Sequence, residues 1–289
     1  MGKGYKGWLD WREIELHNDW GLREKTDAMG EVWNDDADSW DSRWKSDEEF
    51  TKAQAAALEL LPTDTVLDLC CGAGPLTVNV APRVAKVIAQ DYGRDMLAHV
   101  RENCEARGVS NVETLQGNWY SMKPGVDLPV CDVAITRWSP AQGDILKMSC
   151  CAKRQCYSLM TCEPEFAEGG FQNSGYWCRS TVDESQNTTP RPCNRKYGFN
   201  VHFNLLYDHG ANPTISYVTK SKTTTADTKE ELVGKLMKAA RSPKGAGEVP
   251  AGLLALLERG MRQDESGIWV HEASMKIAVL GWDPRDVRY

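Results

Sequence analysis

Hydrophobic and polar positions follow a helix–strand alternation through the middle of the chain. Five apolar runs have the length and composition of strands: residues 65–69, 87–89, 112–115, 130–135 and 155–160. The segments between them repeat apolar residues at helical spacing, and 96–107, ahead of Gly108, is the clearest case. Such alternation is typical of a parallel sheet with helices on both faces. The pattern therefore predicts a doubly wound α/β fold.

Two capping boxes mark the starts of further helices. Ser46 with Glu49 predicts a helix that continues until Pro62, and Thr228 with Glu231 predicts one that continues to about Arg241. The remaining predicted elements are a helix at 199–207, a strand at 214–218, a helix at 253–261, and a closing hairpin or one bent strand over 268–280.

Tryptophan is concentrated at the start of the chain. Six of the eleven indoles lie within residues 1–45: Trp8, Trp11, Trp20, Trp33, Trp40 and Trp44. Two interpretations stay open, which are packing against the main domain and a lid over a flat ligand. We predict a cap at 1–45 and a main domain at 46–289, with a loop insertion at 163–195 and a helical insertion at 228–263.

Composition narrows the class of partner. The 289 residues carry a formal net charge of −7 and no block of basic residues, which argues against nucleic acid and favours a small-molecule substrate. The N-terminus has no apolar signal region, and no apolar run is long enough to span a membrane, so we expect a cytoplasmic protein. The ten cysteines form no CxxC pair and are expected to be reduced; metal binding by the cysteine-rich segment 150–193 is left open.

The chemically most informative residue is Asp68, an acid inside an apolar strand. The strand ends in a turn that contains Gly72 and Gly74, where the backbone can come close to a ligand. A negative charge at that point would repel a pyrophosphate. It would hold a ligand that carries an ammonium and a sulfonium, and S-adenosylmethionine is such a cofactor.

With Asp68 and this glycine turn, the chain resembles the class I S-adenosylmethionine-dependent methyltransferases. The resemblance rests on four ordered pieces, VLDLCCGAGPLT, VIAQDYGRDML, LQGNW and CDVAITR, and covers most of 46–282. It implies a mostly parallel sheet of seven strands, the last antiparallel, with the cofactor beyond strands one and four. Cys70 stands where the family has its first glycine. Cys71 is interpreted as structural.

The resemblance also implies roles for individual residues. Asp91, at the tip of the second strand, would accept hydrogen bonds from the ribose hydroxyls, although an acid favoured by the next helix dipole is the alternative. Arg137 would lie near the methionine carboxylate and the methyl acceptor. The cofactor-binding residues predicted in this way are Asp68, Cys70, Gly72, Gly74, Asp91, Tyr92, Met96, Asn118, Trp119 and Arg137. Tyr92, Met96 and Trp119 would flank the adenine, and Asn118 would bind its edge.

No catalytic base can be assigned from the sequence. Methyl transfer is an in-line displacement, in which a hydroxyl acceptor needs a base but a thiolate or neutral amine does not. The candidate bases are His202, His209, Tyr207 and Glu163, and no pattern distinguishes one of them.

Other functions remain as alternatives to small-molecule methylation. A nicotinamide-dependent dehydrogenase would need a glycine near Thr77 and an apolar residue in place of Asp68. An RNA methyltransferase of the Asn-Pro-Pro-Tyr type would need that tetrad where the chain has Thr136 to Pro140. A protein methyltransferase and a non-catalytic S-adenosylmethionine-binding protein also remain. The preferred acceptor is a small molecule, aromatic and flat or metal-linked, because of the surrounding tryptophans.

Overall fold

The computed structural model describes residues 10–16, 29–164, 199–240 and 260–289. Contacts within the chain divide it into two compact units. The first unit comprises 1–160, 196–218 and 278–289, and the second comprises 161–195 and 219–277. The predicted division into a cap at 1–45 and a main domain at 46–289 follows different boundaries and stays a prediction.

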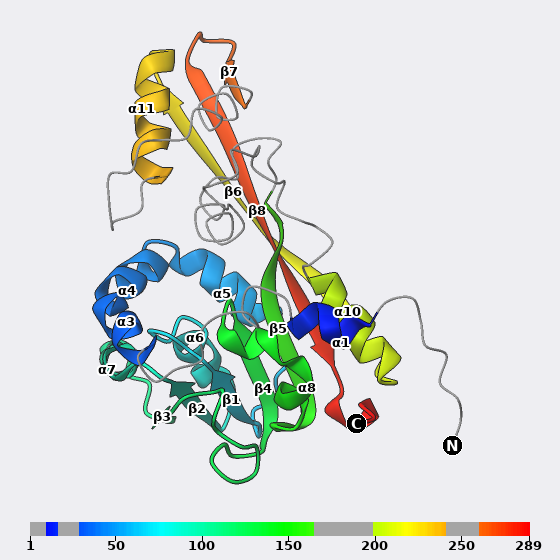
Figure 1. The fold of residues 1–289 in the computed structure, drawn as a ribbon. Helices are drawn as coiled ribbons and strands as arrows, with labels where there is room; N and C mark the ends of the chain where they lie inside the picture. Colours follow the sequence, from blue (N-terminus) through cyan, green and yellow to red (C-terminus); the bar gives the residue numbers. More distant parts are fainter. Residues whose placement is uncertain (1–9, 17–28, 165–198, 241–259) are drawn as a thin grey trace. The chain divides into compact units, whose positions relative to one another are not determined.

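The first unit is built on the parallel sheet that the apolar runs predict (Figure 1). Its strands are β1 (Thr65–Leu69), β2 (Lys86–Asp91), β3 (Val112–Gln116), β4 (Cys131–Arg137) and β5 (Ala152–Pro164). The sheet order is β3-β2-β1-β4-β5-β8-β6, and all the pairs from β3 to β5 are parallel. The predicted doubly wound, mostly parallel sheet of seven strands is confirmed.

Like β5, two further long strands have residues in both units. They are β6 (Thr214–Ala226) and β8 (Trp269–Trp282), and β8 is the single long strand that one of the two predictions for the end of the chain describes. In the second unit β8 also pairs antiparallel with a short eighth strand, β7 (Met261–Gln263). The predicted helix at 253–261 and most of the predicted loop insertion lie outside the described residues.

Helices separate the strands as the periodicity predicts. The α-helices are α1 (Trp11–Leu16), α3 (Met29–Asp35), α4 (Ala37–Lys45), α5 (Glu48–Ala56), α6 (Thr77–Val80), α7 (Arg94–Ala106), α8 (Ile145–Ser149), α10 (Phe199–Asp208) and α11 (Lys229–Ala240). Short 3-10 helices are η1 (Ala81–Arg83), η2 (Pro140–Gly143) and η5 (Pro284–Asp286). Within the described residues no helix is both long enough and apolar enough to cross a bilayer.

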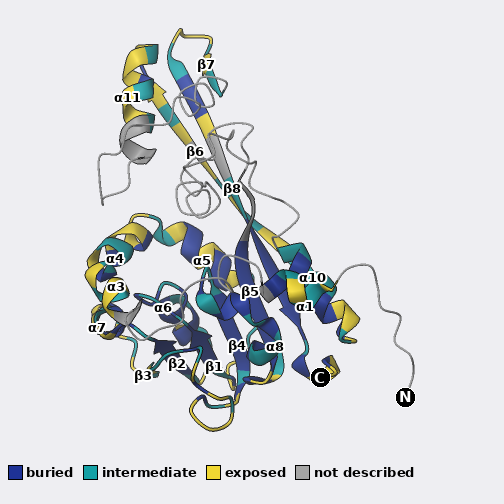
Figure 2. Ribbon diagram, viewed as in Figure 1, coloured by how far each residue is buried: buried dark blue, intermediate teal, exposed yellow. Residues whose placement is uncertain are grey.

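Two apolar cores lie on opposite faces of the sheet in the first unit, whose central strands are buried (Figure 2). Leu67 and Leu69 of β1 belong to the core that includes residues of α8 and α10. Successive side chains of a strand point to opposite faces, so Asp68 lies on the other face. On that face, α4 and α7 form the second core.

The N-terminal helices pack on two different elements. Helices α3 and α4 lie against α7, and Trp44 of α4 is only 5% exposed within the second core. Helix α1 lies against α10 instead, where buried Glu15 accepts a hydrogen bond from the Ile145 amide at 2.9 Å. For Trp44 the structure supports the packing interpretation. Trp8 and Trp20 lie outside the described residues, and the lid stays a prediction.

One of the two predicted capping boxes is wrong. Helix α5 begins at Glu48 and ends at Ala56, short of Pro62, while the Ser46 hydroxyl donates to the Arg43 carbonyl at 2.7 Å. Ser46 therefore closes α4, because the tryptophan-bearing segment continues as a helix up to Lys45. At the second box the helix start is confirmed, since the Thr228 hydroxyl accepts from the Glu231 amide at 3.1 Å, while the Glu231 carboxylate accepts from the Asp227 amide at 3.3 Å.

Candidate functional site

A turn with left-handed backbone follows β1. Its φ angles are 51° at Cys70, 58° at Gly72 and 83° at Gly74. A Cβ on Gly74 would lie 3.1 Å from a Val100 methyl group, whereas a Cβ on Gly72 would meet only the Met96 sulfur, at 4.0 Å. The conformation of Cys70 is one that glycine adopts without strain, which explains why the related family has glycine at this place.

Gln90 holds this turn to the neighbouring strand. Its side-chain oxygen accepts from the Cys70 amide at 3.1 Å, and its backbone carbonyl accepts from the Cys71 amide at 2.9 Å. Its side-chain nitrogen donates to the Gly117 carbonyl at 2.7 Å. Gln90 was not predicted from the sequence. The available signal was a polar residue directly after the apolar run 87–89 and before Asp91.

Asp91 binds the backbone on both sides of the site. One carboxylate oxygen accepts from the Gly72 amide and the other from the Gly93 amide, each at 2.8 Å. Burial raises the pKa of Asp91 above its usual value. Each carboxylate oxygen can accept a second hydrogen bond, so these contacts are compatible with the predicted role of binding the ribose hydroxyls.

Asp68 lies in β1, just before the turn, and is 2% exposed. It accepts a hydrogen bond from the Thr77 hydroxyl at 2.6 Å, which connects β1 to the start of α6. Burial, together with the negative charge of Asp91, raises the pKa of Asp68 to about 7, while Thr77 and Arg137 act in the opposite direction. The carboxyl group is therefore poised to release a proton when a cation binds nearby.

Arg137 closes β4, which is the other neighbour of β1. Its Nε donates to the Gln54 side-chain oxygen at 2.7 Å, and its guanidinium lies 3.8 Å from the centre of the Trp138 ring. Burial lowers the pKa of Arg137 to about 10, so the group remains a cation at neutral pH. The charges of Asp47 and Asp68 favour this cationic form, and the guanidinium can bind an anionic group of a ligand.

The residues predicted to contact adenine follow β2 and β3. Met96 is buried beside Gly93, and the Tyr92 carbonyl accepts a long hydrogen bond from Gln116. Asn118 accepts from the Tyr120 amide through its side-chain oxygen at 3.0 Å. Trp119 is almost wholly buried in the first core, and the Lys147 ammonium lies 4.2 Å from the centre of its ring. Adenine contacts from these four residues stay predictions.

Hydrogen bonds join Asp68 and Asp91 to the elements around the glycine turn. Asp91 binds Gly72 directly, Asp68 binds the helix that starts after Gly74, and the parallel strands place these groups at one edge of the sheet. Two buried carboxylates beside a glycine-containing turn fit a cationic cofactor. S-adenosylmethionine meets that requirement, and a pyrophosphate does not.

The candidate bases do not join this group. Buried His202 has its Nε2 3.8 Å from Glu15, and burial lowers its pKa to about 4. His209 contacts the Arg288 carbonyl, and Tyr207 is 62% exposed. Glu163 lies in β5, but its side chain is outside the described part of the structure. A catalytic base therefore remains unassigned.

The cysteines of the turn have the environment of structural residues. Burial raises the pKa of both the Cys70 and the Cys71 thiol, which disfavours a nucleophilic thiolate. In the described part of the chain no three His, Cys, Asp or Glu side chains could hold a metal ion together. Cys178 and Cys193 lie outside that part, so metal binding by segment 150–193 stays open.

Comparison with known sequences places a methyltransferase domain family model on residues 66–148. Among curated relatives, a tRNA (uracil-5-)-methyltransferase homolog A of Mus musculus is 34% identical over 62 residues, covering 22% of this chain and 10% of the relative. A 2-phytyl-1,4-naphtoquinone methyltransferase of Trichormus variabilis is 37% identical over 71 residues, covering 25% of this chain and 30% of the relative. The chain thus spans less than a third of the length of these two relatives.

Solved structures include two bacterial proteins that are similar over most of the chain. The YcgJ protein of Bacillus subtilis gives a TM-score of 0.48 at 12% identity, covering 83% of this chain and 99% of that protein. A putative methyltransferase of Bacillus halodurans gives 0.47 at 18% identity, covering 81% and 98%. The motif residues, the sheet order and the family model agree with one another. Residues 66–148 therefore match a methyltransferase domain, and the mostly parallel sheet around them is the one that the resemblance predicts.

Proposed function

We propose that the protein transfers a methyl group from S-adenosylmethionine to a small-molecule acceptor. The observation that carries this proposal is the pair of buried acids, Asp68 and Asp91, beside the left-handed turn at Gly72 and Gly74. Together they offer negative charge and close backbone approach, which suit a sulfonium cofactor and disfavour a dinucleotide.

The contribution of the chain is to bind and orient the reacting groups. Gly72 leaves room for the methionine end and Gly74 lets the turn pack against Val100, while Asp91 fixes the turn and has acceptors left for the ribose. When bound, the cofactor supplies a methyl group on a positively charged sulfur, and transfer leaves S-adenosylhomocysteine, a neutral thioether, with the proton lost from the acceptor. Orientation and exclusion of water account for most of the rate enhancement that such an enzyme needs.

Arg137 is proposed to bind the methionine carboxylate, at the strand end where the acceptor also arrives. We expect Arg137→Met to raise the KM for S-adenosylmethionine by about 10- to 100-fold, because a charge-assisted hydrogen bond contributes roughly 1.5–3 kcal/mol. Initial-rate kinetics at varied cofactor concentration measure this. Arg154→Met is the matched control, since Arg154 pairs with the buried Asp64 just before β1, at the opposite edge of the sheet. An unchanged KM in Arg137→Met would contradict the assignment.

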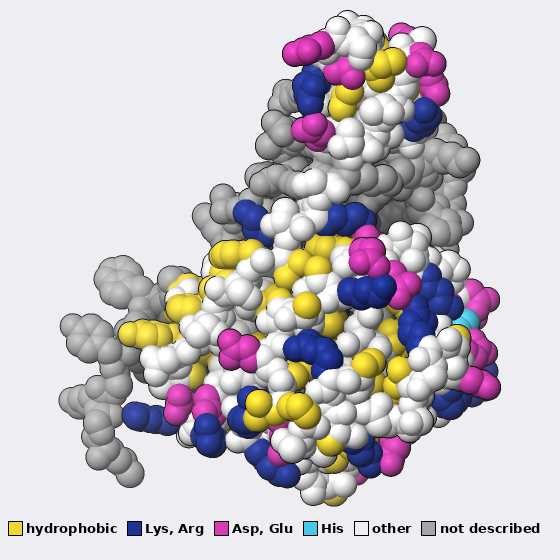
Figure 3. Space-filling model, turned by 180° about the vertical axis from the view of Figure 1, so that it is seen from behind, with side chains coloured by type: hydrophobic (Ala, Val, Ile, Leu, Met, Phe, Trp, Pro, Cys, Tyr) yellow, Lys and Arg dark blue, Asp and Glu magenta, His cyan; other side chains and the backbone are white. Residues whose placement is uncertain are grey.

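Three observations favour a small-molecule acceptor over RNA. The net charge is −7, and on the face shown in Figure 3 the Lys and Arg side chains are interspersed with Asp and Glu. The resemblance to a naphthoquinone methyltransferase is compatible with a flat aromatic acceptor. RNA is the second candidate, because relatives named as tRNA and 23S rRNA uracil methyltransferases match 58 to 65 residues of the chain.

The proposed function can be tested with S-adenosylmethionine that carries a deuterated methyl group. The full chain is incubated separately with a small-molecule extract, total RNA and a protein fraction, and mass spectrometry locates the label. We expect label in the small-molecule sample, and none when excess S-adenosylhomocysteine is added. Label in RNA or protein would overturn the substrate class. Cofactor binding without label in any sample would indicate a non-catalytic binding protein.

A further inference from the structure

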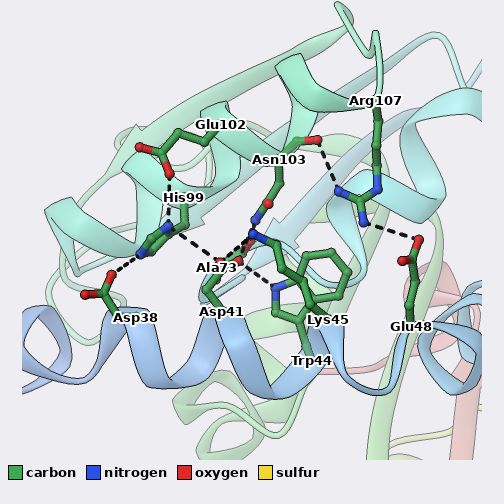
Figure 4. Close-up of polar contacts among 10 residues, drawn as sticks. All are labelled: Asp38, Asp41, Trp44, Lys45, Glu48, Ala73, His99, Glu102, Asn103 and Arg107. Atoms are coloured by element: carbon green, nitrogen blue, oxygen red, sulfur yellow. Dashed lines mark hydrogen bonds and ion pairs between the residues drawn. The ribbon is translucent and has the colours of Figure 1, made fainter.

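A buried acid anchors helix α4 on helix α7. Figure 4 shows Asp41 between the two helices, where one of its oxygens accepts from the Trp44 indole at 3.1 Å and from the Asn103 amide at 2.8 Å. Its other oxygen accepts from Lys45 and lies 3.8 Å from His99. Lys45 and Trp44 therefore hold the carboxylate in position for Asn103.

Asn103 carries this contact to the turn after β1. Its amide nitrogen donates both to Asp41 and to the carbonyl of Ala73, the latter at 3.1 Å, and the residue is 2% exposed. Ala73 lies between Gly72 and Gly74, the two glycines with positive φ. One buried amide thus joins α4 to the centre of the cofactor turn.

A second contact ties α3 to the other side of the site. Asn34 of α3 accepts a hydrogen bond from the Asp95 amide at 3.1 Å, in the first turn of α7. Two residues earlier, the Gly93 amide donates to Asp91. Residues 29–45 are therefore linked to the glycine turn through Asn103, and to the start of α7, two residues after Gly93, through Asn34.

We propose that Asp41 and Asn103 are positioning residues for the cofactor, acting by fixing the Ala73 carbonyl and with it the glycine turn. The inference rests on the proposed function, because it assumes that the turn binds S-adenosylmethionine. It gives α4 a role other than closing over the ligand: the helix braces the turn through α7.

The physical reason is the freedom of the two glycines. A glycine adopts many backbone conformations, so a turn between two of them needs fixed partners to keep one shape. The Ala73 carbonyl has such a partner in Asn103, and Asn103 is itself fixed by Asp41. Without the Asn103 amide, the ligand-free protein would populate other turn conformations. The apparent affinity for the cofactor would then fall in proportion to the fraction of molecules that keep the binding conformation.

The decisive variant is Asn103→Leu, which keeps approximate size and removes the donor. We expect the affinity for S-adenosylhomocysteine to fall about three- to tenfold and the KM for S-adenosylmethionine to rise equally, the amount that one net hydrogen bond accounts for. The kcat at saturating cofactor should stay unchanged, because the reacting groups are not altered. Calorimetric titration and initial-rate kinetics on the full chain provide the values.

Asp41 supplies an independent test should Asn103→Leu fail to fold. Asp41→Asn keeps an oxygen that can accept from Asn103, and it should bind S-adenosylhomocysteine like the wild type. Asp41→Ala removes that oxygen and should weaken binding by the same factor as Asn103→Leu. If the substitutions acted only by destabilising the fold, Asp41→Asn and Asp41→Ala would not differ in affinity in this way.

Two controls separate positioning from damage to the helix interface. Glu48→Gln breaks the 3.2 Å ion pair with Arg107, and Cys104→Ala leaves a small cavity beside Asn103; neither removes the hydrogen bonds of Asn103 to Asp41 and Ala73. Both should retain wild-type affinity. Wild-type affinity in Asn103→Leu or Asp41→Ala would overturn the positioning role and leave the proposed function intact. Absence of binding by the wild-type chain would overturn both.

Discussion

Replacement of Asp68 by asparagine should weaken S-adenosylmethionine binding by about 100-fold, as expected when a buried ligand cation loses its charged partner. The substitution keeps the shape of the side chain and an oxygen for the Thr77 hydroxyl, so the turn and α6 should keep their positions. The change therefore isolates the charge. Asp68→Ala removes the oxygen as well, and it should abolish measurable binding rather than only slow turnover.

The same carboxyl group predicts how cofactor affinity depends on pH. In the folded protein without ligand, the pKa of Asp68 is raised to about 7, so its carboxyl group is largely protonated below that pH. A cationic ligand favours the ionised form, so binding below the pKa must release a proton and weakens by up to about tenfold per pH unit. Affinity should rise as the pH approaches 7 and then level off.

The free energy of unfolding depends on pH with the opposite sign to cofactor affinity. The folded pKa of Asp68 lies above the ordinary value of 3.8, so the folded chain holds more protons than the unfolded chain between about pH 4 and 7. Burial of this group therefore lowers the free energy of unfolding as the pH rises through that window.

Calorimetric titrations between pH 5.5 and 7.5 measure how cofactor affinity depends on pH, and Asp68→Asn should lack this dependence. Equal pH profiles for both proteins would show that Asp68 is not the group responsible.

Replacement of Gly74 by alanine should produce the second large effect. Gly74 has φ 83°, and an added Cβ would lie 3.1 Å from a Val100 methyl group. Strain of this kind lowers the free energy of unfolding by roughly 1–3 kcal/mol. Relief of that strain moves the turn away from the cofactor, and the affinity should fall by at least about tenfold as well. Chemical denaturation and calorimetric titration measure the two quantities.

Cys70→Gly is the matched comparison within the same turn. Cys70 already has a left-handed backbone at φ 51°, so glycine should remove strain at this position. We expect cofactor affinity within about threefold of the wild type, because the amide that donates to Gln90 is retained. A Cys70→Gly protein that loses binding as Gly74→Ala does would contradict the account of the turn.

The edge of the sheet was predictable because local signals agree there. Asp91 and Arg137 each end a strand, Asp68 lies one residue before the end of β1, and a parallel sheet brings these strand ends together. The glycines after β1 carry their backbone requirement in their identity. The fold, and the position of these three residues at one edge of the sheet, therefore follow from the period of the apolar residues and from residue type.

The supports of the site were not predictable in the same way. Gln90, Asp41 and Asn103 act through contacts with residues 19 to 62 positions away, and nothing in their local pattern specifies those partners. Ser46 shows the same limit, because the extent of α4 decides which helix end it caps. Burial of these polar residues becomes visible only when α4 and α7 are packed together.

Binding of S-adenosylmethionine by the turn between β1 and α6 can be tested by direct titration of the full chain. S-adenosylhomocysteine and a nicotinamide dinucleotide are added in separate calorimetric experiments at pH 7.5, with Asp68→Asn in parallel. The account predicts saturable binding of S-adenosylhomocysteine by the wild type, much weaker binding by Asp68→Asn, and no binding of the dinucleotide. Binding of the dinucleotide, or equal binding of S-adenosylhomocysteine by both proteins, would contradict it.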